Sequence, residues 1–441
     1  MKILFISLGC DKNLVDTEVM LGLLASRGYE MTDDERQADI IVINTCCFIH
    51  DAKEESIQNI LEMAEYKKSG QVKALIVTGC LAQRYRQEIL DEIPEVDEVL
   101  GTTAYDKILD VVDRALEGEQ GIILSDLNAL PVSGAKRLVT TGGHFAYLKI
   151  AEGCDKHCTY CIIPKIRGNF RSVPMERLIK EAKELAEQGV KELILVAQET
   201  TLYGKDLYGE KCLHRLVEEL CKIAGIRWIR ILYCYPEEIT DELIEVIKKE
   251  PKVCHYLDLP IQHASDSILK RMGRRTSKQE LTDIVKKLRK EIPDICLRTT
   301  LITGFPGETE DQHEELMQFV DEMEFDRLGV FTYSPEEDTP AAVMPDQIAE
   351  EVKEERQADL MELQQEIAFD NAENMIGREM LVMIEGKVAD ENAYVGRTYR
   401  DAPNVDGLLF VQTAEELNSG DFVRVRITEC MDFELIGEIV K

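Results

Sequence analysis

The most constraining feature of the chain is a long alternation of apolar, strand-like runs with amphipathic helical stretches across residues 1–370. Strands that alternate with helices of this kind pair in parallel sheets, because each helix returns the chain to the edge where the next strand begins. The pattern is interrupted at 119–144, where Gly, Pro, Ser and Thr occur without clear periodicity. We therefore predict an α/β protein with two successive parallel sheets and a connector at 119–144.

The first unit, residues 1–118, is predicted to be an N-terminal doubly wound parallel sheet. Strands are expected at 2–8, 39–45 and 74–79, and helices at 14–27, 52–67 and 82–92.

The second unit, residues 145–375, is predicted to be a partial (β/α)6 barrel, because six strand–helix units suit an open barrel better than a closed eightfold one. Its strands are expected at 147–151, 192–197, 227–233, 255–260, 296–303 and 327–332, with helices between them, for example at 174–188 and 277–290. A long charged helix is expected at 350–374.

The last unit, residues 376–441, changes to short strands and turns. Five strands are expected, at 379–384, 393–398, 408–412, 422–427 and 435–440. This pattern predicts a small C-terminal β-barrel.

The chain is strongly acidic, with 84 Asp and Glu against 52 Lys and Arg, a net charge of −32. Nucleic-acid binders normally carry a basic surface, so nucleic acid is not expected as the main substrate, although a local basic patch could still bind it. The charge fits a basic protein partner better, or it serves solubility alone. No apolar run approaches the ~20 residues that cross a bilayer. We expect no membrane partner and a cytoplasmic location.

The chain has 13 cysteines, and we expect metal ligands or catalytic groups among them rather than disulfides, because we expect no secretory signal and a reducing compartment. Six of them lack paired spacing and are expected to be core residues: Cys212, Cys221, Cys234, Cys254, Cys296 and Cys430. The strongest motif is Cys154-Asp-Lys-His-Cys158-Thr-Tyr-Cys161, directly after a predicted strand. Three thiolates from one loop can hold three irons of a 4Fe–4S cluster and leave the fourth iron open to substrate. The alternatives are buried free cysteines or a zinc knuckle, for which His157 would be an awkward fourth ligand.

A second cysteine set follows from the topology. Cys10, Cys46 and Cys80 each end a predicted strand of the first unit, and the carboxyl ends of parallel strands lie on one edge of the sheet. The three can therefore converge and hold a second cluster, the alternative being three unrelated small hydrophobic residues. Because successive strand residues point to opposite faces, only one of Cys46 and Cys47 should be a ligand. We predict Cys46 and leave the role of Cys47 open.

Polar or glycine-bearing segments also end strands of the second unit, at 197–201, 260–265 and 304–309. Barrels place their catalytic residues there, although ordinary turn chemistry is the alternative. His263 is as compatible with a structural role as with a catalytic one. Arg298 lies in an otherwise apolar strand and needs a partner, for which a substrate carboxylate is a candidate.

The C-x3-C-x2-C spacing, with an aromatic before the last cysteine, resembles the radical S-adenosylmethionine superfamily. The resemblance implies that the open iron chelates S-adenosylmethionine, that reduction yields a 5′-deoxyadenosyl radical, and that Tyr160 lies near the adenine. Further contacts to S-adenosylmethionine are predicted for Gln198, Thr200, Gln262, Ser265, Arg298 and Gly304. No protein acid or base is assigned.

The whole chain resembles the radical methylthiotransferases, which join a three-cysteine domain, a radical domain and a TRAM barrel. One branch modifies an adenosine beside the tRNA anticodon, and the other an aspartate of small-subunit ribosomal protein S-12. The opening Ser7-Leu-Gly-Cys10-Asp-Lys-Asn13-Leu-Val-Asp16-Thr-Glu18 is similar to the ribosomal branch, as are 163–168 and 198–204. Residues 377–441 carry 13 acidic and 7 basic residues, which suits a basic protein better than tRNA.

This resemblance implies two 4Fe–4S clusters and two S-adenosylmethionine molecules per turnover. One would methylate a sulfur carried on the Cys10/Cys46/Cys80 cluster, and the other would be cleaved at the Cys154/Cys158/Cys161 cluster. The radical would abstract hydrogen from the aspartate β-carbon, which would then couple with the methylated sulfur. The implied partners are ribosomal protein S-12, an electron donor such as flavodoxin or ferredoxin, and a sulfur donor. The alternatives are a tRNA methylthiotransferase, an iron–sulfur electron carrier and a zinc-binding interaction protein.

Overall fold

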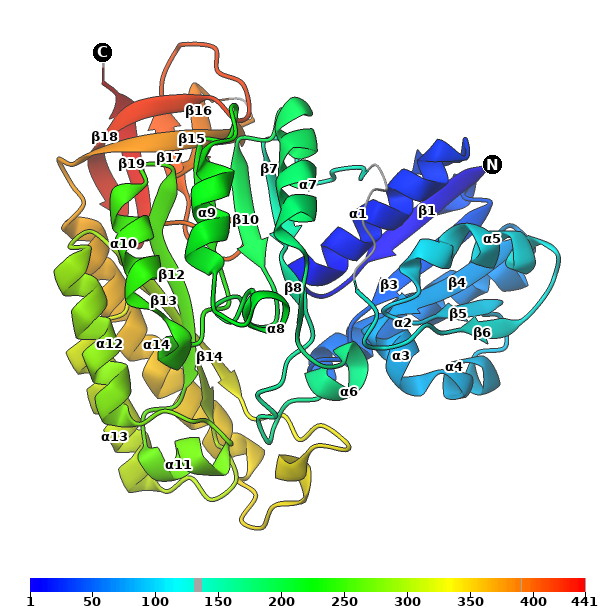
Figure 1. The fold of residues 1–441 in the computed structure, drawn as a ribbon, viewed down its shortest axis with the longest axis horizontal. Coiled ribbons are helices and arrows are strands. Elements are labelled where there is room, and N and C mark those ends of the chain that lie inside the picture. Colours follow the sequence, from blue (N-terminus) through cyan, green and yellow to red (C-terminus); the bar gives the residue numbers. More distant parts are fainter. Residues whose placement is uncertain (131–136, 390, 441) are drawn as a thin grey trace.

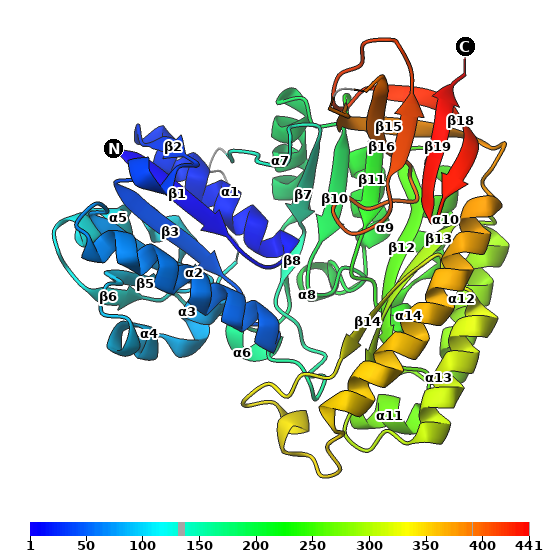
Figure 2. The same cartoon turned by 180° about the vertical axis from the view of Figure 1, so that it is seen from behind.

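The computed structural model describes residues 1–130, 137–389 and 391–440, so part of the predicted connector, 131–136, lies outside the described residues. Figures 1 and 2 show an N-terminal sheet with its helices, a larger central sheet beside it, and a small barrel at one end of the central sheet. The predicted fold class is confirmed, since both large sheets are parallel and the last strands close into a barrel.

The first sheet has six parallel strands in the order β2-β1-β3-β4-β5-β6. The strands are β1 (Lys2–Ser7), β2 (Glu30–Thr32), β3 (Ile40–Thr45), β4 (Ala74–Gly79), β5 (Glu98–Leu100) and β6 (Gly121–Ile123). Every residue of β3 and β4 is buried, as expected for a parallel sheet covered on both faces. The short strands β2 and β5 were not predicted, and β6 lies within the range predicted as a connector, because three residues are too few to show a period.

Helices cover both faces of this sheet, which makes it doubly wound. One face packs against α1 (Asp11–Ser26) and α5 (Ile108–Leu116). The other packs against α2 (His50–Lys68), α3 (Cys80–Tyr85) and α4 (Gln87–Glu92). The helix predicted at 82–92 is thus two short helices, separated at Arg86, whose φ is 44°.

The central sheet is open and parallel, in the order β14-β13-β12-β11-β10-β7. Its strands are β7 (Phe145–Lys149), β10 (Glu192–Val196), β11 (Trp228–Ile231), β12 (Val253–Gln262), β13 (Cys296–Thr303) and β14 (Arg327–Thr332). Its larger helices are α7 (Met175–Glu187), α9 (Leu213–Cys221), α10 (Asp241–Lys249), α12 (Lys278–Glu291), α13 (Glu310–Met323) and α14 (Glu350–Glu373). The apolar faces of these helices and the sheet form the largest core.

Shorter elements connect the main ones. They are α6 (Ile163–Arg167), α8 (Lys205–Tyr208), α11 (Asp266–Arg271), the ribbon β8 (Ala151–Glu152) with β9 (Arg171–Ser172), and the 3-10 turns η1 (Glu35–Gln37), η2 (Tyr105–Lys107), η3 (Pro236–Glu238) and η4 (Pro340–Val343). Among the described helices, none is both long and apolar enough to span a membrane.

The C-terminal barrel closes in the order β15-β16-β17-β19-β18. Its strands are β15 (Glu379–Lys387), β16 (Ala393–Arg397), β17 (Leu409–Gln412), β18 (Phe422–Met431) and β19 (Glu434–Ile439). The barrel packs on the central sheet through a mixed apolar cluster that includes Trp228 and Phe422, whose ring centroids lie 4.8 Å apart. It therefore belongs to the same packed body as the central sheet.

Candidate active site

Three neighbouring strands bring Cys10, Cys46 and Cys80 together. Cys10 caps α1 after β1, Cys46 follows β3, and Cys80 begins α3 directly after β4. Burial, together with the nearby Cys80 and Cys10 thiols, raises the pKa of the Cys46 thiol to about 12. The three thiols thus lie close enough to interact electrostatically, while their role as cluster ligands stays a prediction.

Two glycines allow the chain to approach itself closely at this edge. Gly9 has a φ of +86°, and a Cβ there would lie 2.6 Å from Cys46 Cβ and 2.8 Å from Cys46 Sγ. Gly79 has a φ of +93°, and a Cβ there would lie 2.3 Å from Asn44 Oδ1. Both positions need the left-handed backbone that glycine adopts without strain. The backbone at these two glycines can therefore pass directly beside Cys46 and Asn44.

Asn13 ties the three cysteine-bearing loops together. Its Nδ2 donates to the carbonyls of Leu8 and Thr45, at 3.0 Å each, and its Oδ1 lies 3.7 Å from Cys80 Sγ. Asn13 is completely buried. Asn13 lies in the opening sequence motif, but no role could be predicted for it, because its partners Thr45 and Cys80 are distant along the chain.

Replacing Asn13 by alanine is expected to loosen this edge. The change removes the donor to two buried carbonyls, and each unsatisfied group costs about 1–3 kcal/mol. We expect a lower thermal unfolding midpoint and less iron bound per chain after anaerobic reconstitution. Asn59→Ala is the control, because Asn59 is partly exposed on α2 and its side chain donates to a backbone carbonyl of the same helix, that of Glu55. Equal iron content and equal midpoints in the two variants would contradict this role.

The second cysteine set lies in the loop after β8. Burial raises the pKa of Cys154 to about 12, with the Cys158 thiol adding to the effect, and burial also raises the pKa of Cys161. His157 is exposed and has a φ of 52°, so the loop turns at this residue. Within the described ranges, no three His, Cys, Asp or Glu side chains converge on a point where a single metal ion could bind.

A cavity of about 180 Å³ lies beside this loop and is lined by Tyr160 and Gln262, two of the predicted contacts to S-adenosylmethionine. A larger cavity of about 580 Å³ shares Ile49 and residues 331–334 with it and is also lined by Asp51, Glu350 and Glu354. The two cavities therefore adjoin, with the acidic residues around the larger one.

The other predicted contacts already have partners within the chain. The Thr200 hydroxyl donates to the Leu232 carbonyl at 2.8 Å, and the Ser265 N–H donates to His263 Nδ1 at 2.9 Å. Arg298 finds its partner in Asp258, 3.0 Å away, rather than requiring a substrate carboxylate. Gly304 is packed against α14, where a Cβ would lie 2.2 Å from Lys353 Cγ. Contact of these four with S-adenosylmethionine stays a prediction.

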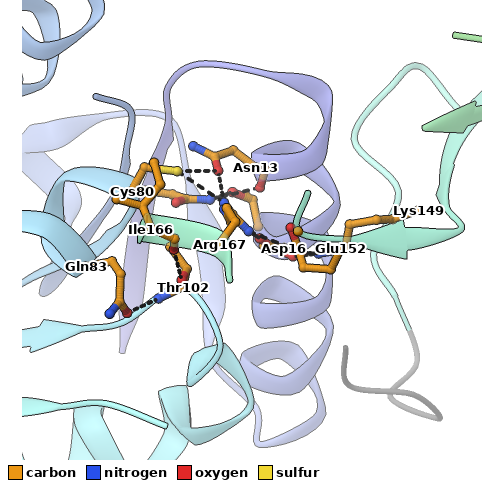
Figure 3. A network of polar contacts seen from close by, with 12 residues as sticks. Asn13, Asp16, Cys80, Gln83, Thr102, Lys149, Glu152, Ile166 and Arg167 are labelled. Carbon is orange, nitrogen blue, oxygen red and sulfur yellow. Dashed lines mark hydrogen bonds and ion pairs between the residues drawn. The ribbon is translucent and has the colours of Figure 1, made fainter. Parts of the chain in front are cut away.

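A buried polar network runs from Cys80 of the first cysteine set to Glu152 and Lys149, shortly before the loop that carries the second set (Figure 3). Arg167 on α6 donates from Nη2 to Cys80 Sγ at 3.4 Å and to Asn13 Oδ1. Its Nη1 pairs with Asp16 Oδ2 at 2.8 Å and with Glu152 Oε2 at 3.3 Å. The guanidinium therefore spans from a thiol of the first set to carboxylates of α1 and β8.

The same network continues to the second cysteine set. Gln198 Nε2 donates to Glu152 Oε1 at 2.7 Å, and Gln198 Oε1 accepts from the N–H of Gly153 at 2.9 Å. Gly153 directly precedes Cys154. Lys149 pairs with Glu152 at 2.8 Å and also with Asp16. Both ends of the Gln198 amide are thus used within the chain, and its predicted contact with S-adenosylmethionine remains untested.

Comparison with known proteins places this geometry in a family. Residues 2–101 match the uncharacterized protein family UPF0004, residues 148–320 match the radical SAM superfamily, and residues 376–440 match the TRAM domain. The chain is 67% identical over 437 residues to the ribosomal protein uS12 methylthiotransferase RimO of Lachnoclostridium phytofermentans, covering 99% of each chain. It is 50% identical to the RimO of Clostridioides difficile, covering 100% of this chain and 99% of that one.

The chain belongs to the RimO family of ribosomal protein uS12 methylthiotransferases. The predicted family and branch are therefore confirmed, and the chain is a radical S-adenosylmethionine methylthiotransferase. Membership also implies S-adenosylmethionine and a 4Fe–4S cluster as cofactors. Family membership therefore excludes the alternatives of an iron–sulfur electron carrier and a zinc-binding interaction protein.

Solved structures share the fold of this RimO family member at low sequence identity. The radical methyltransferase TsrM from Kitasatospora setae, with tryptophan substrate and a SAM analogue bound, aligns with a TM-score of 0.55 and 14% identity, covering 78% of this chain and 75% of that one. The cobalamin-dependent radical enzyme OxsB aligns with a TM-score of 0.51 and 13% identity, covering 83% and 56%. These likenesses concern the fold alone.

His263 is completely buried in this RimO family member, and its environment holds it neutral. Burial lowers its pKa to about 3, with His313 and Arg356 adding to the effect. Its Nε2 lies 3.8 Å from Glu308 Oε2, which is an ion-pair distance only for a protonated ring. Since burial keeps the imidazole uncharged, this contact is not an ion pair. The geometry supports the structural interpretation of His263.

The neutral state of His263 predicts an acid-sensitive stability. An unfolded histidine takes up a proton near pH 6.5, whereas the folded one does so only near pH 3. Its contribution is therefore fully present above about pH 6.5 and is lost as the pH falls, by about 2 kcal/mol between pH 7 and pH 5. We expect His263→Gln to show a smaller drop in unfolding free energy than the wild type over this range, measured by urea denaturation. An unchanged pH dependence would contradict it.

Proposed function

We propose that this enzyme methylthiolates the β-carbon of an aspartate in ribosomal protein uS12, using two 4Fe–4S clusters and two S-adenosylmethionine molecules per turnover. The observation that supports it most is the pairing of two buried three-cysteine sets, joined by one polar network, in a chain that is 67% identical to a uS12 methylthiotransferase. The finer assignments of carbon atom, cluster number and stoichiometry are part of the proposal.

The residues present fit two iron–sulfur clusters. Soft thiolates are the ligands that such clusters prefer, and each set offers three of them, so one iron of each cluster is left open. Cys10, Cys46 and Cys80 hold one cluster, and Cys154, Cys158 and Cys161 hold the other. Gly9 lets the backbone pass closely beside Cys46, so that the cysteine-bearing loops can approach one another. When bound, such clusters supply reductive cleavage of S-adenosylmethionine and a sulfur atom for transfer.

The protein's own contribution is to position the reactants and exclude water. Four of the six thiols belong to buried residues, and the other two, Cys10 and Cys161, are half-buried. Tyr160, which precedes Cys161, and Gln262 line the smaller cavity of about 180 Å³, which we call the inner cavity. The adenosine of S-adenosylmethionine binds there. A confined, dry site of this kind holds the target carbon at a fixed distance and protects a reactive radical from side reactions.

The larger cavity of about 580 Å³, which we call the outer cavity, is suited to a basic protein segment. Asp51, Glu350 and Glu354 line it, and it adjoins the inner cavity through Ile49 and Phe331. Opposite charge favours encounter and orientation of a lysine- and arginine-rich substrate. Residues 377–441 carry 13 acidic against 7 basic residues, so the barrel adds to the same preference.

The proposed division of labour follows the predicted boundaries. Residues 1–118 carry the auxiliary cluster, 119–144 connect, 145–375 carry out the radical chemistry, and 376–441 assist docking. The enzyme acts in the cytoplasm, where flavodoxin or ferredoxin delivers electrons and a separate donor delivers sulfur.

The test is anaerobic reconstitution followed by reaction with a reductant, S-adenosylmethionine, sulfide and purified uS12. Peptide mass spectrometry is expected to find a methylthio group in place of hydrogen on one aspartate. Formation of 5′-deoxyadenosine without any modified aspartate would overturn the substrate assignment. Modification of tRNA in a parallel reaction would then favour the tRNA branch.

A further inference from the structure

We infer that Arg167 is a positioning residue of the Cys10/Cys46/Cys80 site, and that its guanidinium raises the reduction potential of the cluster held there. The inference rests on the proposed function, because it takes Cys80 to be a cluster ligand. It goes beyond that function in assigning a tuning role to a residue outside both cysteine sets.

The contact between Arg167 and Cys80 joins two parts of the chain. Arg167 ends α6, which follows the Cys161 loop, whereas Cys80 begins α3 in the first sheet. The side chain of Arg167 is 2% exposed, and its Nη2 lies 3.4 Å from Cys80 Sγ. The donor to a thiol of one cluster site thus comes from the segment that directly follows the proposed ligands of the other site.

Several buried partners fix the direction of the guanidinium. Asp16 and Glu152 bind Nη1, and Asn13 Oδ1 accepts from Nη2. Lys149 pairs with the same two carboxylates, so two cations face two anions. Arginine suits this position because its rigid fork serves two carboxylates and a sulfur at once and stays charged at any working pH.

A charged donor beside a ligand sulfur has a predictable effect on potential. Hydrogen bonds to the sulfurs and the local net charge both set the potential of an iron–sulfur cluster. The reduced cluster carries one more negative charge than the oxidised one, so a nearby cation stabilises it. Screening is weak because the contact is buried. Loss of the guanidinium therefore favours the oxidised state.

The experiment isolates the first site in the full-length chain. Cys154→Ala, Cys158→Ala and Cys161→Ala are combined so that reconstituted iron binds at the first site alone, and the cluster is titrated by EPR-monitored potentiometry. In this background, Arg167→Gln is expected to shift the reduction equilibrium at least tenfold toward the oxidised state, which is about 59 mV for a one-electron couple.

Arg171→Gln is the matched control. Arg171 is also buried, lies four residues further along, and donates to the backbone carbonyls of Arg167 and Ala129. Arg171→Gln therefore also removes a buried positive charge, but it leaves the donor to Cys80 in place. We expect less than about a threefold shift in this variant. A shift equal to that of Arg167→Gln would overturn the inference.

The remaining outcomes separate the inference from the proposed function. A cluster that forms normally in Arg167→Gln with an unchanged potential overturns the role of Arg167 alone. Failure of the background protein to bind iron with Arg167 intact overturns the proposed auxiliary site instead. If Arg167→Gln does not fold, the same potentiometric titration of Arg167→Lys tests the inference. Its ammonium cannot reach both carboxylates and the sulfur, so a shift of about threefold is expected, and no shift overturns the inference.

Discussion

Replacing Cys80 by alanine is expected to abolish methylthio transfer to uS12 while 5′-deoxyadenosine is still formed, whereas replacing Cys158 abolishes both products. The two thiols belong to separate sets, one at the edge of the first sheet and one in the loop after β8. Loss of either is expected to lower the rate of methylthio transfer by roughly a thousandfold or more, because acid–base chemistry cannot activate an unactivated C–H bond. Peptide mass spectrometry and chromatography of the nucleoside in one reaction measure the two products.

Cys47→Ala is the matched control for this prediction. Cys47 is adjacent to Cys46 and equally buried, but it packs within the apolar core on one face of the first sheet. Its loss removes one sulfur atom from that core, which is a packing change, and methylthio transfer should persist. A loss of transfer as large as that of Cys80→Ala would show that the neighbouring thiol, and not the predicted one, serves the cluster.

The strands that carry the cysteines could be predicted because they are long and continuously apolar. β3 and β4 are each six residues long and fully buried, so their ends, and hence Cys46 and Cys80, are visible in the sequence. The strands β2, β5 and β6 have three residues each and could not be recognised. They lie away from the cysteine-bearing strand ends or at the edges of the sheet, so missing them did not affect the predicted site.

The polar network was not predicted, because its members are far apart along the chain. Arg167 and Asp16 are separated by 151 residues, and nothing local pairs them. A signal did exist: Lys149 and Glu152 are charged residues at the end of a predicted buried strand, and buried charges need partners. The same rule was applied to Arg298, but the partner is Asp258 of the adjacent strand β12, which only the register between the strands reveals.

The largest effect on stability is expected for Glu192→Gln, at the contact between the central sheet and the barrel. Glu192 on β10 is completely buried and pairs with Arg230 and with Arg397 of β16, at 2.8 Å each. Burial acts to raise the pKa of Glu192, but Arg397 and Arg230 outweigh it and hold the carboxyl below its usual range. Removing this charge leaves the buried Arg230 without a carboxylate partner among the described residues, whereas Arg397 keeps its pair with Glu385. Breaking a buried ion pair in this way costs about 3–5 kcal/mol.

The single tryptophan of the chain reports on this contact, since Trp228 pairs with Glu192 in the sheet and packs edge-on against Phe422 of the barrel. Its fluorescence during urea denaturation is expected to show a much lower midpoint in Glu192→Gln than in the wild type. Glu245→Gln, which breaks an exposed pair with Lys249, should leave the midpoint close to that of the wild type. Similar midpoints for the two variants would mean that the apolar cluster around Trp228 holds the barrel without help from the ion pairs. The buried charges would then matter for the orientation of the barrel against the sheet rather than for its attachment.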